Sequence, residues 1–516
     1  MFFSFQTVRG LTFLQLCAIS IGLFFTHALF TAIYNVYFHP LRNFPGPFWA
    51  KVTIFYEYYW DNIQDGQFTN HCYEVLHPKY GPVVRVAPHK LRVNGTGDFF
   101  KIHAMGTTFT KDPHFYSHGN REGVLALLEN KPHHERRKLL APLFSKTTIA
   151  KLQPLVQEKI DRLLIRIKAD ERKAGLRRDR YVFDCFRYFQ AIVSDVLMKF
   201  AFEKSYDALG QESLTHSLLE SSEKLIENIP TFKYLPGWAH KIIQAVPPWL
   251  AQIILKPIGE HSRFQAQIFT EIVDLFKRKN AGLLKPRAAN EPPTVFSELI
   301  DIYPSEHALS NDSVTIYSAG SITVTHNLSH AVFLLAKNKV IHQRVFQEIK
   351  AIWPTLETRP SYEQLEKLPY LTAVVKEVLR LSPGVIGGIA RRVPKGGVTL
   401  SDRFIPEDTS IDSSIYNMNM NPDVFHDPFK FDPERWLQPD SILLEKYSVS
   451  FGLGSRNCLG IYLAYLEIYM ILAAIIRNFE WECTEVCERE GWKWVDRWSP
   501  AKRGDPGTFY FKSRAE

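Results

Sequence analysis

Apolar residues recur at helical spacing, three or four positions apart, over long stretches of this chain. The stretches that this pattern predicts as helices are 149–168, 190–203, 259–278, 311–336, 338–352 and 362–382. Short runs of β-branched and aromatic residues predict strands at Val83–Val86, Leu91–Val93, Val398–Leu400 and Thr508–Phe511. Because the helical stretches cover far more of the chain than the strands, the pattern predicts a mainly α fold with small β-sheets.

The N-terminal region has a different pattern. No Asp, Glu, Lys or Arg occurs between Arg9 and Arg42, and about twenty apolar residues suffice to span a bilayer. The run is too long for a cleaved signal peptide, which would have a shorter apolar core. A buried core helix is an alternative to a membrane span. Arg42 and Lys51 follow the run, which favours a cytosolic position for the rest of the chain. We expect a single-pass membrane anchor at 1–40 and one large domain at 41–516.

A second membrane-facing candidate lies between Pro230 and Ile258. Its large apolar residues are Trp238, Ile242, Ile243, Trp249, Ile253 and Ile254. Core packing explains these residues as well as membrane contact does. The basic, proline-containing stretch Lys277–Pro293 predicts an exposed linker within the same domain.

Composition narrows the class of protein. The chain has 516 residues, of which 45% are hydrophobic and 22% charged, as in a globular protein with a sizeable core. Its six cysteines are scattered and predict no disulfide framework. The net charge of +8 suits acidic partners or a membrane surface. No basic block with interleaved aromatic residues indicates a nucleic-acid partner, so we expect none.

Near the C-terminus, one cysteine lies in a glycine-punctuated loop before an apolar helix. The loop reads Phe451-Gly-Leu-Gly454-Ser-Arg456-Asn-Cys458-Leu-Gly460. The start of a helix favours a thiolate, and glycines let the backbone turn sharply and approach a flat group. Arg456 offers a permanent cation that can hold a carboxylate. A buried free cysteine beside a helix cap is the alternative.

This loop matches the haem-binding signature of cytochrome P450 enzymes, Phe-x-x-Gly-x-Arg-x-Cys-x-Gly, without a gap. The resemblance implies the cytochrome P450 fold behind an N-terminal transmembrane helix, with heme b as the cofactor. It makes Cys458 the axial thiolate ligand of the iron and places Arg456 on a haem propionate. Phe451, Gly454 and Gly460 would complete the binding loop.

Two further motifs precede this loop, Lys376-Glu377-Val-Leu-Arg380 and Pro433-Glu-Arg435-Trp436. Glu377 and Arg380 are three apart on one helical face and can pair. Alone, this spacing predicts only a surface ion pair. Because the family combines the two motifs, the resemblance implies one buried network of Glu377, Arg380 and Arg435 with a structural role.

Haem propionates need cations, and the resemblance supplies three more candidate contacts. In His133-His-Glu-Arg-Arg137, His133 takes the tryptophan position and Arg137 the arginine position of the family's Trp-x-x-x-Arg helix. Arg391 fits a further propionate contact. A surface histidine is the alternative for His133.

Ser318-Ala319-Gly320-Ser-Ile322-Thr323-Val324 resembles the family's central-helix motif Ala/Gly-Gly-x-Asp/Glu-Thr-Thr/Ser. The resemblance implies that Gly320 lets bound dioxygen approach the helix backbone and that Thr323 hydrogen-bonds it. Ile322 replaces the motif's acid and cannot relay protons. Two possibilities then remain open: water chains deliver the protons, or the enzyme uses the iron differently. Alternatively, Thr323 only bonds back to a helix carbonyl.

The resemblance implies a haem-thiolate monooxygenase that inserts one oxygen atom from O2 by hydroxylation or epoxidation. Because no flavin or dinucleotide fingerprint occurs in the chain, electrons are expected from NADPH through NADPH-cytochrome P450 reductase, with cytochrome b5 as an optional further donor. The basic run Arg136–Lys138 is expected to steer the acidic reductase. The implied location is the endoplasmic reticulum membrane, with the catalytic domain in the cytosol.

The substrate is expected to be lipophilic, because the expected pocket walls are mostly apolar and aromatic. These walls are Gly106–Gly123, Tyr317, Ala319 and Val385–Ile389. The His39-Pro-Leu-Arg run and the His133 variant resemble microsomal, filamentous-fungal members of secondary metabolism of the trichodiene-oxygenase type, which implies a terpenoid or polyketide.

The missing acid at Ile322 motivates an alternative enzyme class. A haem-thiolate isomerase, dehydratase or peroxide-dependent enzyme would need no proton relay. A non-catalytic haem-binding protein is a second alternative.

Overall fold

The structure is a computed structural model of the 516-residue chain. It describes residues 12–116, 122–177, 180–235, 256–284, 292–303, 306–504 and 507–515, with the single positions 239, 246 and 250.

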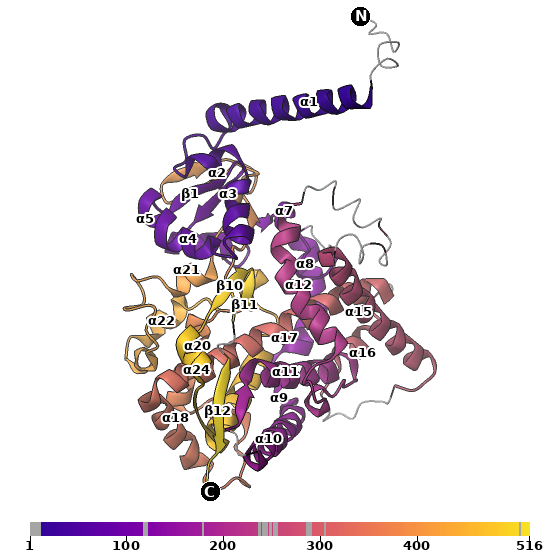
Figure 1. Ribbon diagram of the computed structural model, residues 1–516, viewed down its shortest axis with the longest axis vertical. Coiled ribbons are helices and arrows are strands. Elements are labelled where there is room, and N and C mark those ends of the chain that lie inside the picture. The colour runs from indigo at the N-terminus through magenta and orange to yellow at the C-terminus, as the bar shows by residue number, and fades with distance from the viewer. Residues whose placement is uncertain are drawn as a thin grey trace, which may run out of the picture.

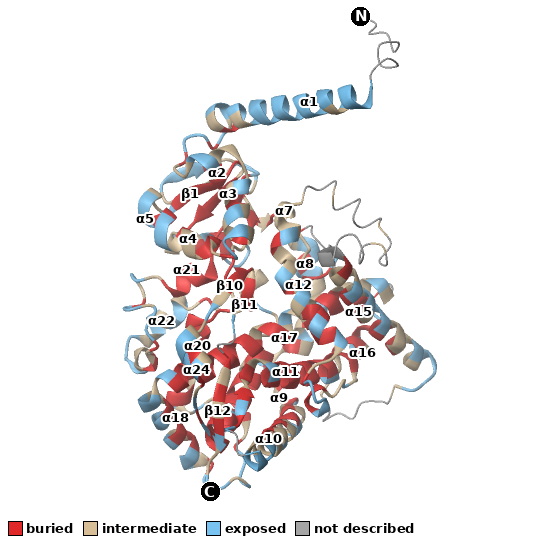
Figure 2. Ribbon diagram, viewed as in Figure 1, coloured by how far each residue is buried: buried red, intermediate tan, exposed pale blue. Residues whose placement is uncertain are grey.

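A long, largely buried helix, α17 (Glu306–Lys337), lies in the middle of the helical body (Figure 1). The helices that pack around it include α11 (Cys185–Phe202), α15 (Lys256–Asn280), α18 (Lys339–Ile352), α20 (Pro369–Leu381) and α23 (Ile461–Asn478), while α10 (Gln153–Leu176) packs on α11 and α23. Figure 2 shows α11 and α17 mostly in the colour of buried residues. A helix buried on most of its surface belongs to the core of a large domain, so α17 organises the fold.

The predicted mainly helical architecture is confirmed, and two predicted helices are each divided by a proline. The stretch 149–168 is split between α9 (Lys146–Ala150) and α10, which has Pro154 in its first turn. The stretch 362–382 is split between α19 (Tyr362–Leu365) and α20, which begins at Pro369. Proline lacks the N–H that a helix interior needs but fits a first turn, so each proline starts a new helix.

Short elements complete the helical part. They are α2 (Phe48–Val52), α3 (Phe55–Tyr58), η3 (Tyr59–Ile63), α4 (Phe68–His71), η4 (Cys72–Leu76), α5 (His77–Tyr80), α6 (Thr96–His103), α7 (Pro113–Tyr116), α8 (Asn130–Leu140), η5 (Ala141–Phe144), η6 (Ala208–Gly210), α12 (Ser217–Lys233), α16 (Val295–Leu299), α21 (Ile415–Asn419), η7 (Pro433–Leu437), α22 (Ser441–Tyr447), η8 (Gly454–Arg456) and α24 (Glu485–Glu490).

The β-structure is small, as predicted. One five-stranded sheet has the order β1-β2-β8-β5-β3, from β1 (Val83–Ala87), β2 (Lys90–Val93), β8 (Ser410–Asp412), β5 (Arg391–Arg392) and β3 (Thr110–Lys111). A second has the order β4-β12-β9, from β4 (Val182–Asp184), β12 (Thr508–Ser513) and β9 (Phe479–Cys483). Two hairpins are β6 (Val398–Leu400) with β7 (Arg403–Ile405), and β10 (Trp494–Arg497) with β11 (Ser499–Lys502).

An exposed apolar helix, α1 (Phe13–Ile33), extends away from the body and continues as η2 (Tyr34–Phe38) (Figures 1 and 2). Its most apolar 18-residue window has a mean hydropathy of 2.0 and no buried residue, so the span Phe13–Phe38 is long and apolar enough to cross a membrane. Helix α23 passes the same test of composition, but 78% of it is buried. Helix α23 is therefore a core helix, and only α1 with η2 has the exposure of an anchor among the described residues.

Two predicted surface segments are only partly described. The six large apolar residues of the candidate segment between Pro230 and Ile258, expected to face either the membrane or the core, lie outside the described residues. The predicted linker from Lys277 is helical at its start, because α15 continues to Asn280, and residues 285–291 lie outside the described part.

Candidate functional site

Cys458 lies between the turn η8 and the start of α23. Its backbone N–H donates to the Phe451 carbonyl oxygen at 2.8 Å, which closes the loop. Gly454 has a φ of +66°, and a Cβ there would collide with the backbone oxygen of His103. The glycine at 454 is therefore required by this sharp turn and by the close approach of the end of α6, while its predicted place against a flat cofactor stays a prediction.

Gly460 has a different role. Its φ of −87° is open to any residue, so no turn demands a glycine here. A Cβ added at Gly460 would meet no atom within 4 Å. The glycine leaves open space beside Cys458, as the approach of a flat group to the thiol requires.

The thiol needs a ligand to become a thiolate. Desolvation by the surrounding protein raises the pKa of Cys458, although the residue is exposed to the open space beside the loop, while the Gly460 N–H and the Arg137 guanidinium act to lower it. The protein environment alone therefore favours the protonated thiol. A bound metal ion replaces the proton and stabilises the thiolate.

A cluster of basic side chains lies beside this loop. It consists of Lys111, His133, Arg137, Arg391 and Arg456. Burial and then the charge of Arg456 lower the pKa of His133 to about 3. Burial and then the charge of Arg391 lower the pKa of Arg456 to about 10. Lys111 and Arg391, which are 4% exposed, sit opposite one another in the β3–β5 pair.

In the described part of the chain, no carboxylate forms an ion pair with these five side chains. Arg456 instead donates to the carbonyl oxygens of Leu127 and Leu128, both at 2.7 Å, and Arg391 to that of Ala390 at 2.9 Å. Burying unpaired cations is costly, so the cluster fits a ligand with more than one carboxylate. The two propionates of a haem satisfy this requirement.

Lys111 was missed by the sequence analysis. It follows no motif, and only the β3–β5 pairing brings it to Arg391. Burial, Arg391 and Arg456 together lower the pKa of Lys111 well below its usual range. An anionic ligand would restore the charge of this ammonium group.

Arg137 contacts the cysteine loop directly. Its guanidinium donates to the backbone oxygen of Asn457 at 2.7 Å and to the Asn457 Oδ1 at 2.6 Å. Arg137 therefore tethers α8 to the residue before Cys458, and the propionate role predicted for it stays a prediction. Arg136 pairs with Asp312 at 2.6 Å. The predicted basic run Arg136–Lys138 is consequently not a free patch, because two of its three cations point inward.

Helix α17 presents Ala319 and Thr323 on one face. Ala319 is exposed and Thr323 half-buried, and a Cβ on Gly384 would lie 2.9 Å from the Thr323 Cβ. The segment after Pro383 therefore packs against Thr323. The Thr323 hydroxyl donates to the Ala319 carbonyl oxygen at 2.9 Å, which is the back-bonded state given above as the alternative.

Gly320 faces a different neighbour. A Cβ at Gly320 would lie 2.9 Å from the Leu197 Cδ2 on α11. The missing side chain lets α11 and α17 pack closely. The missing side chain thus serves helix packing, and the predicted role of Gly320 toward dioxygen stays a prediction.

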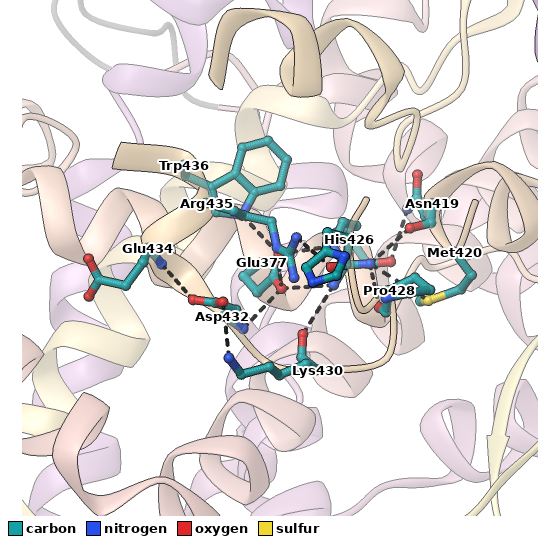
Figure 3. A network of polar contacts seen from close by, with 11 residues as sticks. Glu377, Asn419, Met420, His426, Pro428, Lys430, Asp432, Glu434, Arg435 and Trp436 are labelled. Atoms are coloured by element: carbon teal, nitrogen blue, oxygen red, sulfur yellow. Dashed lines mark hydrogen bonds and ion pairs between the residues drawn. The ribbon is translucent and has the colours of Figure 1, made fainter. Parts of the chain in front are cut away.

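The predicted network of Glu377, Arg380 and Arg435 is present and buried (Figure 3). Arg380 donates to both Glu377 oxygens, through Nε at 2.9 Å and Nη2 at 2.8 Å. Arg435 Nε donates to Glu377 Oε1 at 3.0 Å and Trp436 Nε1 to Oε2 at 2.9 Å. The Asp432 N–H adds a bond at 3.1 Å. One carboxylate is thus satisfied by five donors, as a buried charge requires.

The network reaches the cysteine loop through Asn419. Arg380 Nη1 donates to the Asn419 carbonyl oxygen at 2.9 Å. The Asn419 side chain accepts from the Val449 N–H at 3.0 Å and donates to Ser450 Oγ at 2.9 Å. Val449 and Ser450 directly precede Phe451, so the network positions the start of the loop. These bonds through Asn419 are the way in which the network would perform its predicted structural role.

Comparison with known proteins agrees with this geometry. Residues 48–494 match the family model described as Cytochrome P450. Cytochrome P450 monooxygenase macH of Penicillium terrestre is 31% identical over 95% of this chain and 96% of its own length. Cytochrome P450 monooxygenase BOT1 of Botryotinia fuckeliana is 30% identical, over 93% and 92%. Cytochrome P450 monooxygenase TRI4 of Trichoderma arundinaceum is 31% identical, over 87% and 86%.

These relatives confirm the predicted resemblance to fungal members. The family binds haem iron through a cysteine, and Cys458 is the residue that the loop, the open space at Gly460 and the cluster of basic side chains single out. The chain belongs to the cytochrome P450 family and is an oxidoreductase of the monooxygenase class.

Proposed function

We propose that this P450 monooxygenase hydroxylates or epoxidises a lipophilic secondary metabolite such as a terpenoid or polyketide. Electrons come from NADPH through NADPH-cytochrome P450 reductase, with cytochrome b5 as an optional further donor. When bound, the haem supplies the cleavage of the O–O bond, which its thiolate ligand favours. Cys458 holds the iron, and His133, Arg391, Arg456 and the added Lys111 hold the propionates.

The observation that carries the substrate class is the chemistry of the surface facing this site. Thr323 on α17 lies against Gly384, which begins a segment whose Val385 and Ile389 are half-buried, and Ala319 is exposed on the same face of the helix. Among these described wall residues none is charged, and the one hydroxyl belongs to Thr323. Such a wall favours a lipophilic molecule. The Thr323 hydroxyl can leave the Ala319 carbonyl by rotation and then donate toward this side.

The alternative of an isomerase, dehydratase or peroxide-dependent enzyme rests on Ile322. Ile322 is buried at 5% exposure and carries no proton. The relatives reported above are all named monooxygenases, which favours the use of O2. Proton delivery must then involve other groups.

Labelled oxygen separates these functions. The purified full-length protein, reconstituted with reductase and NADPH, is expected to form product only in the presence of O2. Under 18O2, one labelled atom should enter each product molecule. Product formed under argon would support the isomerase reading, and product formed at the same rate from H2O2 alone would support the peroxide-dependent one.

We further propose that residues 1–40 form a single-pass anchor in the endoplasmic reticulum membrane and that domain 41–516 faces the cytosol. The exposed apolar helix α1 supports the anchor. The arginine and lysine that follow it support the orientation.

The substitution Lys111→Met is expected to weaken haem retention. Methionine has a similar length but no charge, so one of the proposed propionate contacts is lost. Loss of a charge-assisted hydrogen bond of about 1.5–3 kcal/mol corresponds to a haem dissociation rate about 10- to 100-fold faster. Transfer of haem to an excess of apomyoglobin measures this rate. The exposed Lys131 in the same region provides the control Lys131→Met, which should leave the rate unchanged.

A further inference from the structure

Two histidines follow Ile322 along one face of α17. His326 and His330 are four and eight residues further on, and residues four apart lie above one another on a helix. They are 1% and 8% exposed. Four residues rise by about 6 Å, and the two imidazole ring centroids are 6.2 Å apart. The face therefore carries two buried imidazoles in a line that begins beside the missing acid.

The two imidazoles have polar atoms without a protein partner. Among the described residues, no group hydrogen-bonds the Nδ1 atom of His326 or of His330, or the indole N–H of Trp492. Trp492 stacks on His330 at 4.9 Å and lies 5.7 Å from His326. Buried polar groups are normally satisfied, and internal water is the usual partner where protein supplies none. A water molecule placed between the two rings would supply a partner to both Nδ1 atoms.

The line has an outer and an inner end. At the outer end, Trp492 is half-buried and its neighbour Lys493 is exposed, so solvent lies next to His330. At the inner end, His326 is one turn from Ile322 and from Thr323, whose hydroxyl bonds to the Ala319 carbonyl oxygen and is freed by rotation. The Asn327 amide donates to the Thr323 carbonyl oxygen at 2.8 Å and holds this turn in place.

We propose that His330 and His326, bridged by internal water, relay protons along α17 from the Trp492 side to the Thr323 hydroxyl. They would thereby replace the acid that is absent at Ile322. This inference rests on the monooxygenase assignment and not on the identity of the substrate. A neutral imidazole accepts a proton at one nitrogen and releases one from the other. Each proton that enters at His330 is therefore matched by one that leaves Thr323, and no charge accumulates.

The protonation state of the pair agrees with this role. Burial lowers the pKa of His326 to about 3, and burial together with His326 lowers that of His330 well below its usual range. Both imidazoles are consequently neutral at pH 7. The competing explanation is that the two rings only fill an aromatic box with Trp492 and Phe333.

The first test needs no variant. A high-resolution crystal structure of the holoenzyme is expected to show ordered water within hydrogen-bonding distance of the Nδ1 atoms of His326 and His330. The absence of such water, with both Nδ1 atoms bonded to protein or to nothing, would overturn the proposal.

The second test uses His326→Phe, which keeps a ring but removes the relay. Product formed per NADPH is expected to fall at least threefold, with the difference recovered as H2O2. The solvent deuterium isotope effect on product formation should rise at least twofold. His330→Phe should act in the same direction, and it replaces His326→Phe if that variant does not retain haem.

His342→Phe is the matched control. His342 is also 8% exposed, has an unpartnered Nε2 and lies against an indole, Trp481 at 4.0 Å, but it is on α18. The variant His342→Phe should leave the coupling ratio, the product formed per NADPH consumed, unchanged. Adding Ile322→Glu to His326→Phe should restore the ratio, because an acid again stands beside Thr323. Equal losses in the His326 and His342 variants, or no recovery in the double variant, would show that the histidines serve packing alone.

Discussion

The variant Cys458→Ser is expected to lose the red-shifted Soret band of the reduced carbon monoxide complex and all monooxygenase activity. A serine hydroxyl is far less acidic than a thiol and does not give the iron the electron density that favours O–O cleavage. The loop itself should survive, because the Cys458 N–H bond to the Phe451 oxygen does not involve the side chain. Difference spectroscopy of the purified protein measures the loss.

A second cysteine provides the control for this result. Cys483, half-buried at the end of β9, should tolerate Cys483→Ser with an unchanged spectrum. A red-shifted band that persists in Cys458→Ser would mean that another residue ligates the iron. In that case the placement of the whole site on this loop would be wrong.

Contacts close in sequence were predictable because short motifs carry them. Glu377 and Arg380 are one helical turn apart, and the loop from Phe451 to Gly460 is contiguous. The direction of a side chain across the fold was not predictable. Gly320 packs on Leu197 from another helix, and Arg137 finds Asn457 about 320 residues away. A motif names residues, but only packing decides which neighbour each one serves.

Long-range strand pairing set a further limit. Lys111 and Arg391 meet because β3 pairs with β5, and two-residue strands leave no periodicity to detect. The predicted boundaries of two helices were wrong for a local reason, and the sequence did contain that reason. Pro154 and Pro369 each mark a new start, which apolar spacing alone ignores.

The variant Glu377→Gln should destabilise the protein by about 3 kcal/mol, because it leaves the buried Arg380 guanidinium without a counter-charge. Glutamine keeps the size and one acceptor oxygen of Glu377, so the loss is one of charge and not of packing. Arg380 is 0% exposed, so water cannot compensate.

Because Arg380 bonds to Asn419 and Asn419 bonds to the start of the cysteine loop, the substitution should also disturb that loop. Haem content and the midpoint of urea unfolding should therefore fall together. The exposed pair Arg344–Glu434, from the neighbouring residue of the same Pro-Glu-Arg-Trp motif, provides the control. Because exposed ion pairs contribute at most about 1 kcal/mol, Glu434→Gln should shift the midpoint only slightly. If the two variants shifted the urea midpoint equally, the buried network would not stabilise the loop. If Glu377→Gln lowered the midpoint at full haem content, the network would stabilise the fold without positioning Cys458.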